Sequence, residues 1–195
     1  MASNLQQTPS ANYHTPTGPL SLGQAIQALP GQYLKVITRP SVSAFVEEKS
    51  KANWRIVWVQ LIALSIIDAI LQYLNLLISP PNVSNVASTS GLSTSTLQTV
   101  TVLTLVLFTL IFTPVSFFIG VGILHLIAKA FRGKGTFLQL LYVTLLFGVP
   151  MVILSYLLTF IPATSNWLPY LPHIYSIILF VFAVIAVHRR TAETK

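Results

Sequence analysis

Apolar residues gather along the chain in four long runs, residues 56–78, 100–128, 137–161 and 170–187. Each run is long enough to cross a hydrocarbon core of about 30 Å as an α-helix, which rises about 1.5 Å per residue. Polar segments separate the runs, so residues 56–190 are expected to form one membrane domain. The pattern therefore predicts an all-α membrane protein with four transmembrane helices in a bundle.

Prolines mark the ends and the weak points of these spans. A Ser-Pro-Pro sequence at 79–81 ends the first run, and a loop rich in Asn, Ser and Thr follows over residues 82–98. The second run is longer than one straight crossing needs and contains Pro114, so we expect it to be tilted or kinked at this residue. The third run carries Pro150 near its middle, where a second kink is expected.

The segment before the first run, residues 21–55, has a weaker amphipathic pattern. Its apolar residues recur at nearly helical spacing: Leu22, Ile26, Leu29, Leu34 and Ile37. This spacing favours a short helix, broken at Pro30-Gly31, that either lies on the membrane surface or packs under the bundle. Residues 1–20 are expected to be a disordered tail, and residues 191–195 a cytoplasmic tail.

Composition excludes a soluble globule. The chain is 53% hydrophobic and only 8% charged, whereas soluble proteins average about 25% charged residues. Too few polar side chains are available to cover a globule of 195 residues. We therefore expect a multi-pass integral membrane protein, located in the plasma membrane if the source is prokaryotic.

Basic residues indicate the orientation of the spans. They lie in three groups: Lys35, Arg39, Lys49, Lys51 and Arg55 before the first span, Lys129, Arg132 and Lys134 between the second and third, and Arg189, Arg190 and Lys195 after the fourth. The loops at 79–99 and 162–169 contain no Lys or Arg. Because Lys and Arg are retained on the cytoplasmic side, both termini are expected in the cytoplasm.

The same composition limits the chemistry and the partners. A net charge of +7 that flanks apolar runs favours anionic lipid head groups as a partner and not nucleic acid. Zero cysteines exclude disulfides and thiolate metal sites, and the histidines lack ligand spacing, so no metal or cofactor is expected. Four acidic residues leave little for general acid–base catalysis, and an enzyme is not expected.

A polar stripe runs along the first span. Ser65, Asp68, Gln72 and Asn75 are spaced by three or four residues, which places them on one face of a helix. A carboxylate at the depth of Asp68 costs a few kcal/mol unless it faces protein or water. The stripe is therefore either a hydrogen-bonded seam that joins helices or a site for a proton or cation.

A second group of candidate residues lies at the link between the second and third spans. It consists of His125, Lys129, Arg132, Gly133, Lys134 and Gly135. His125 is either a proton shuttle or an interfacial hydrogen-bonding residue. The Gly-Lys-Gly sequence lacks the full phosphate-loop pattern and predicts a tight cytoplasmic turn. Before the first span, Glu47 and Glu48 lie next to Lys49 and Lys51 and are expected on a solvated face.

Three stretches of sequence carry a pattern beyond hydropathy. Residues 36–40 (VITRP) and 44–45 (AF) lie just before the first span. Residues 124–137 link the second and third spans through a short glycine turn that ends in Thr-Phe, and residues 142–150 place a proline in the third span. Together with a looser match at 188–192, these stretches resemble the Yip (Ypt-interacting protein) domain family in its prokaryotic form.

The resemblance implies the membrane fold of that family and membrane residence, and it carries over no defined activity. Family members usually have five spans, whereas four are predicted here. Our leading hypothesis is a non-enzymatic membrane organiser or adaptor that binds a membrane or cytoplasmic protein through residues 21–55, 129–136 and 188–195. The alternative is a small transporter or channel subunit that uses the stripe around Asp68 and acts as a homo-oligomer.

Overall fold

The computed structural model of the chain describes residues 21–161 and 167–188. Within them the elements are α1 (Leu22–Thr38), α2 (Val42–Lys49), α3 (Trp54–Ile78), α4 (Ser84–Ser90), α5 (Thr94–Ala130), α6 (Phe137–Thr159), η1 (Leu168–Tyr170) and α7 (Leu171–His188). The tails expected at 1–20 and 191–195 lie outside the described residues, as do Arg189 and Arg190.

The prediction of four long apolar helices is confirmed. The helices α3, α5, α6 and α7 are each long and apolar enough to cross a membrane. The bounds of α3, α6 and α7 lie within two residues of the predicted runs. Local sequence explains several of these starts. For example, Thr136 and Gln139 form a capping box that satisfies backbone N–H groups at the start of α6.

The loop expected between the first two spans is partly helical. Residues 84–90 form α4, and α5 begins at Thr94 instead of near residue 100. Ser93 provides the reason, because its hydroxyl accepts a hydrogen bond from the backbone N–H of Thr96 and caps the helix. The polar Ser and Thr residues that follow predict a loop by composition, yet they extend the helix once it is capped.

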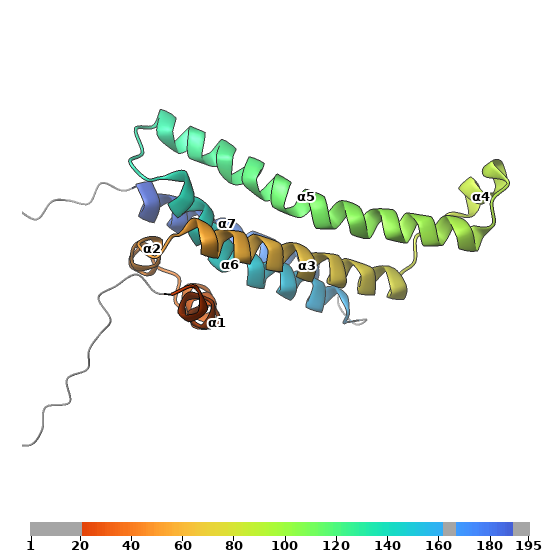
Figure 1. Ribbon diagram of the computed structural model, residues 1–195, viewed down its shortest axis with the longest axis horizontal. Coiled ribbons are helices and arrows are strands. Elements are labelled where there is room, and N and C mark those ends of the chain that lie inside the picture. Colours follow the sequence, from red (N-terminus) through yellow and green to blue (C-terminus); the bar gives the residue numbers. More distant parts are fainter. Residues whose placement is uncertain (1–20, 162–166, 189–195) are drawn as a thin grey trace, which may run out of the picture.

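The helix α6 lies at the centre of the fold. Figure 1 shows α3, α6 and α7 running side by side, with α5 along α3. The first half of α6 is almost completely enclosed, since residues 140–147 are all buried. Neighbours cover it on several sides: α3, α7, α5, α1 and α2 all contact it. The core of the protein is therefore built around this helix.

The helix α5 has the opposite character. It packs mainly along α3, and within Thr94–Ala130, all of which the structure describes, Val121 is the one buried residue. Figure 1 shows its two ends extending away from the other long helices, and shows the helix bent in its middle part. Pro114 lies near the middle, where its ring removes one backbone hydrogen bond from the helix. Most of the apolar surface of α5 is left for lipid.

The two short helices α1 and α2 form a hairpin against one end of the bundle. In Figure 1 they are seen almost end-on while the long helices run across the view. The predicted break at Pro30-Gly31 is wrong, because α1 continues through both residues. The missing hydrogen bond at Pro30 is outweighed by packing, since Leu29 and Val36 on the same helix are buried in the core.

Candidate functional site

Five segments meet at one end of the bundle, which we call the basic end. They are the α1–α2 hairpin, the start of α3, the end of α5, the start of α6 and the end of α7. Its described Lys and Arg residues are Lys35, Arg39, Lys49, Lys51, Arg55, Lys129, Arg132 and Lys134. The described segments at the opposite end, 79–99 and 167–169, contain no Lys or Arg.

Polar side chains join the hairpin to the long helices. The hydroxyl of Tyr142 on α6 donates to Gln32 Oε1 at 2.9 Å, and both residues are buried. The hydroxyl of Tyr33 donates to Gln60 Oε1 on α3 at 3.3 Å, and burial raises the pKa of Tyr33 to about 12. These bonds fix the hairpin against α3 and α6, so of the two sequence alternatives it packs on the bundle.

The helix α2 is anchored by an aromatic contact and an ion-pair cluster. Phe45 is fully buried, and its ring meets that of Phe147 edge-to-face with centroids 6.2 Å apart. Glu48 is only 1% exposed, and it accepts from Lys35 Nζ at 3.1 Å and from Lys51 Nζ at 2.9 Å. The two lysines compensate the buried carboxylate, which would be costly alone.

The solvated face predicted for Glu47 and Glu48 is correct only for Glu47. Successive residues of a helix point about 100° apart, so the packing of α2 turns one carboxylate inward and the other outward. Glu47 pairs with Lys35 at 2.7 Å on the surface. Their hydrogen bond lowers the pKa of Glu47 and raises that of Lys35.

Lys49 connects the hairpin to the end of α7. Its Nζ donates to the backbone carbonyl of Ala186 at 2.7 Å. Ala186 lies in the last turn of α7, whose carbonyls have no partner within the helix. A cation at this position also favours the negative end of the helix dipole. The sequence alone indicates only a topological role for Lys49, because its partner lies 137 residues further along the chain.

The predicted tight turn between α5 and α6 closes α5 with a Schellman motif. Arg132 has a φ of 62°, and its N–H donates to the carbonyl of Lys129 at 2.9 Å. The N–H of Gly133 donates to the carbonyl of Ala128, also at 2.9 Å. This left-handed position usually takes glycine. Here an arginine occupies it, and the two glycines that follow serve a different purpose.

Gly133 and Gly135 allow the turn to lie directly on the end of α7. A Cβ atom on Gly133 would come within 2.4 Å of His188 Nδ1, and one on Gly135 within 2.5 Å of the backbone oxygen of Val187. The sequence placed residues 188–195 on the same face as these glycines, but their contact with His188 and Val187 has no sequence signal, because only tertiary packing brings α7 beneath the turn. The turn and the end of α7 therefore form one surface.

His125 and His188 face each other across the basic end. Their ring centroids are 5.4 Å apart, and Phe137 at the start of α6 lies 5.8 Å from the ring of His125. His125 Nδ1 and both ring nitrogens of His188 are buried without a hydrogen-bond partner in the described part of the protein. Buried nitrogens of this kind are uncommon in native structures. Among the described residues no group of three potential ligands could hold a metal ion.

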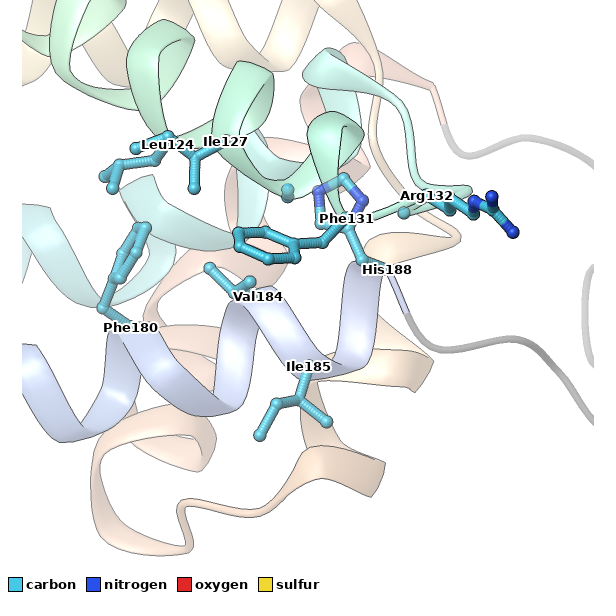
Figure 2. Close-up of a pocket in the computed structure, with 10 residues that line it drawn as sticks. Leu124, Ile127, Phe131, Arg132, Phe180, Val184, Ile185 and His188 are labelled. Carbon is cyan, nitrogen blue, oxygen red and sulfur yellow. The ribbon is translucent and has the colours of Figure 1, made fainter.

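An apolar cleft of about 620 Å³ opens between the ends of α5 and α7. Figure 2 shows Leu124 and Ile127 pointing into it from α5, and Phe180 and Val184 from α7. Phe131, which is 84% exposed, projects between the two helices. Arg132 and His188 line the end of the cleft at the turn, and Figure 2 shows the exposed guanidinium of Arg132 pointing outward from it.

Residues of the polar stripe of α3 bond to two different helices. Thr113 Oγ1 on α5 donates to Asp68 Oδ2 at 2.6 Å, and the hydroxyl of Tyr156 on α6 donates to Gln72 Oε1 at 2.9 Å. Ser65 is buried and donates to the carbonyl of Leu61 within its own helix. Asn75, near the end of α3, is partly buried. Asp68 and Gln72 thus lie where α3 meets α5 and α6.

Comparison with known proteins agrees with the architecture described above. No curated protein and no solved structure matches the chain. The Yip1 domain family matches residues 34–195, which include the last turn of α1, all of α2, all four long helices and the α5–α6 turn. The chain is a multi-pass membrane protein that belongs to the Yip1 domain family.

Proposed function

We propose that this protein is a non-enzymatic membrane organiser or adaptor that acts through its basic end. The hairpin, the α5–α6 turn and the end of α7 are held together by buried contacts, so a partner would meet a preformed surface. A preformed surface loses less conformational entropy on binding than flexible loops do. This rigid arrangement of segments far apart in the sequence is the observation that carries the proposal.

The basic end faces the cytoplasm in this proposal, so both termini lie there. Support comes from the distribution of Lys and Arg, which are retained on the cytoplasmic side and are absent from the loops at the opposite end. In a prokaryotic cell the membrane would be the plasma membrane. Anionic lipid head groups would then surround the basic end, and a membrane or cytoplasmic protein would bind its outer surface.

The orientation can be tested with single cysteines, because the chain has none of its own. Ser95 and Lys134 are exposed and lie at opposite ends of α5 and the turn that follows it. Lys134 is a better position than Gly133, where a side chain would collide with His188. An impermeant reagent should label S95C and K134C from opposite sides, and labelling from the same side would overturn the topology.

The adaptor role can be tested by extraction of the full chain into lipid discs, followed by mass spectrometry of the proteins that co-purify. Leu34 is 63% exposed on α1, whereas Leu92 is 51% exposed at the opposite end. We expect a stoichiometric partner that is lost in Leu34→Asp and retained in the matched control Leu92→Asp. Discs that contain only copies of this chain and lipid would contradict the proposal.

The competing proposal, a transporter or channel subunit, depends on Asp68. This carboxylate is only partly buried near the middle of a candidate span, with the Thr113 hydroxyl as a hydrogen-bond donor. A proton or cation flux through liposomes that Asp68→Asn abolishes, with expression unchanged, would favour this function over the adaptor. The homo-oligomer that such a pathway needs would be measured by the mass of the protein in discs.

A further inference from the structure

We propose that the cleft between the ends of α5 and α7 binds one anionic phospholipid, with an acyl chain between the helices and the phosphate at Arg132 and His188. The proposal requires only membrane residence, which the family assignment supplies, and it is independent of the adaptor function. It differs from general attraction to a charged membrane surface, because it assigns one lipid molecule to one cleft.

The depth of the cleft matches a lipid that enters from the adjacent leaflet. Leu124 lies two helical turns before Phe131, and Phe180 lies just over two turns before His188. The apolar walls therefore extend on the order of 10 Å from the basic end toward the bilayer centre. Figure 2 shows the side chains of both walls pointing into the space between the helices. An acyl chain is the apolar group present at that depth in a membrane.

The charge at the mouth is complementary to a phosphate. Arg132 is exposed at the mouth, and Lys129 and Lys134 on either side of it are exposed as well. In residues 21–161 and 167–188, the ion pairs are made by Lys35 and Lys51, so these three cations have no acidic partner there. An arginine and nearby lysines without acids form a favourable site for a lipid phosphate.

His188 has buried ring nitrogens without hydrogen-bond partners in the described residues, which is uncommon in native structures. The residue lines the cleft, and Lys129 lies within electrostatic range of its ring. A phosphate oxygen at the mouth would provide an acceptor for an N–H of this ring once the side chain turns toward the mouth.

Two variants separate the charge from the cleft. Arg132→Gly removes the cation at a left-handed position that glycine adopts without strain, so the turn should stay folded. Its charge-matched control is Arg39→Gln, at an exposed position between α1 and α2. Ile127→Trp fills the cleft from a half-exposed position, and Ile119→Trp places the same side chain on exposed α5 surface outside the cleft.

The experiment is native mass spectrometry of the full chain, purified in an equimolar mixture of phosphatidylglycerol and phosphatidylcholine with identical acyl chains. The wild-type chain should retain phosphatidylglycerol about fivefold more than phosphatidylcholine. Arg132→Gly should remove most of this preference and Ile127→Trp should lower retention of both lipids, while the two controls behave as wild type. Equal retention of both lipids by the wild type, or unchanged retention in Ile127→Trp, would overturn the proposal.

Discussion

The helices α5 and α6 are almost equally apolar but occupy opposite environments. Their most apolar windows have mean hydropathies of 2.4 and 2.2, yet none of the α5 window is buried inside the protein and 56% of the α6 window is. In water such a difference would expose α5 to aggregation, whereas lipid tails solvate either helix equally well. Hydropathy therefore determines that a segment crosses the membrane, and packing determines its place in the fold.

The largest expected effect comes from a matched leucine truncation in the two helices. Leu145 on α6 is fully buried, and Leu107 on α5 is 59% exposed. Leu145→Ala should lower the free energy of unfolding by about 2–3 kcal/mol, because it leaves a cavity that neighbours fill only in part. Leu107→Ala should change it by less than about 0.5 kcal/mol. Unfolding by SDS in mixed micelles measures both, and equal losses would refute the central position of α6.

A pair of glycines gives the next largest contrast. Gly135→Ala, in the turn that leads into α6, should destabilise the protein by about 1–3 kcal/mol, because the new methyl group meets the backbone of Val187. A methyl group at Gly120 on α5 would meet no described atom within 4 Å, so Gly120→Ala should be neutral or stabilise by up to about 1 kcal/mol. Thermal unfolding in detergent compares the two. Destabilisation of the protein by Gly120→Ala would instead indicate that another molecule packs against α5 at this position.

The seam between α3 and α5 tests how weakly α5 is attached. Thr113→Val removes the donor to Asp68 and should cost about 0.6 kcal/mol and at most about 1.7 kcal/mol, the mean and the maximum measured for hydrogen bonds between membrane helices. Asp68→Asn keeps an acceptor and should cost less than Asp68→Leu. The double-mutant cycle of Thr113→Val with Asp68→Leu measures the coupling directly. Additive losses would show that the bond does not join the helices.

The smallest effect is a pH dependence in the hairpin that covers α6. The pKa of Glu47 is lowered from 4.5 by its bond to Lys35, so the contribution of this pair is present above pH 4.5 and is lost as the pH falls through the lowered value. The pKa of Lys35 is raised above 10.5, so in alkaline solution the pair keeps its stabilising contribution up to pH 10.5 and loses it as the pH rises through the raised value. Thermal unfolding of Glu47→Gln should differ from wild type at pH 6 and converge with it in acid.

Sequence patterns predicted the bounds of most spans well and the helical structure of the segments that flank them poorly. Hydropathy and proline positions placed α3, α6 and α7 within two residues, and the capping sequence at Thr136 is readable in the chain. The continuation of α1 through Pro30 could not be predicted from the sequence. The sequence shows the local cost of a proline in a helix, but it does not show that Leu29 and Val36 pack in the core. The start of α5 at Thr94 was missed because a serine cap was outweighed by a loop-like composition.

The candidate site shows the same division at single residues. The repeated spacing of Asp68 and Gln72 predicted a shared face, and the structure supplied their partners on α5 and α6. The Gly-Lys-Gly sequence predicted a turn, but its physical reason, contact with His188 and Val187, depends on a helix about 50 residues later in the chain. The cleft has no local signature at all, because its two walls lie on separate helices.

The sequence by itself determined that this protein resides in a membrane, how many long apolar helices it forms and that its basic residues gather at one end. These properties follow from local composition, since lipid accepts any sufficiently long apolar helix. Only the tertiary structure decided that α6 is central and α5 peripheral, that Glu48 is buried between two lysines, and that the α5–α6 turn rests on α7. These properties depend on the shapes and positions of side chains from distant segments, which pattern alone does not contain.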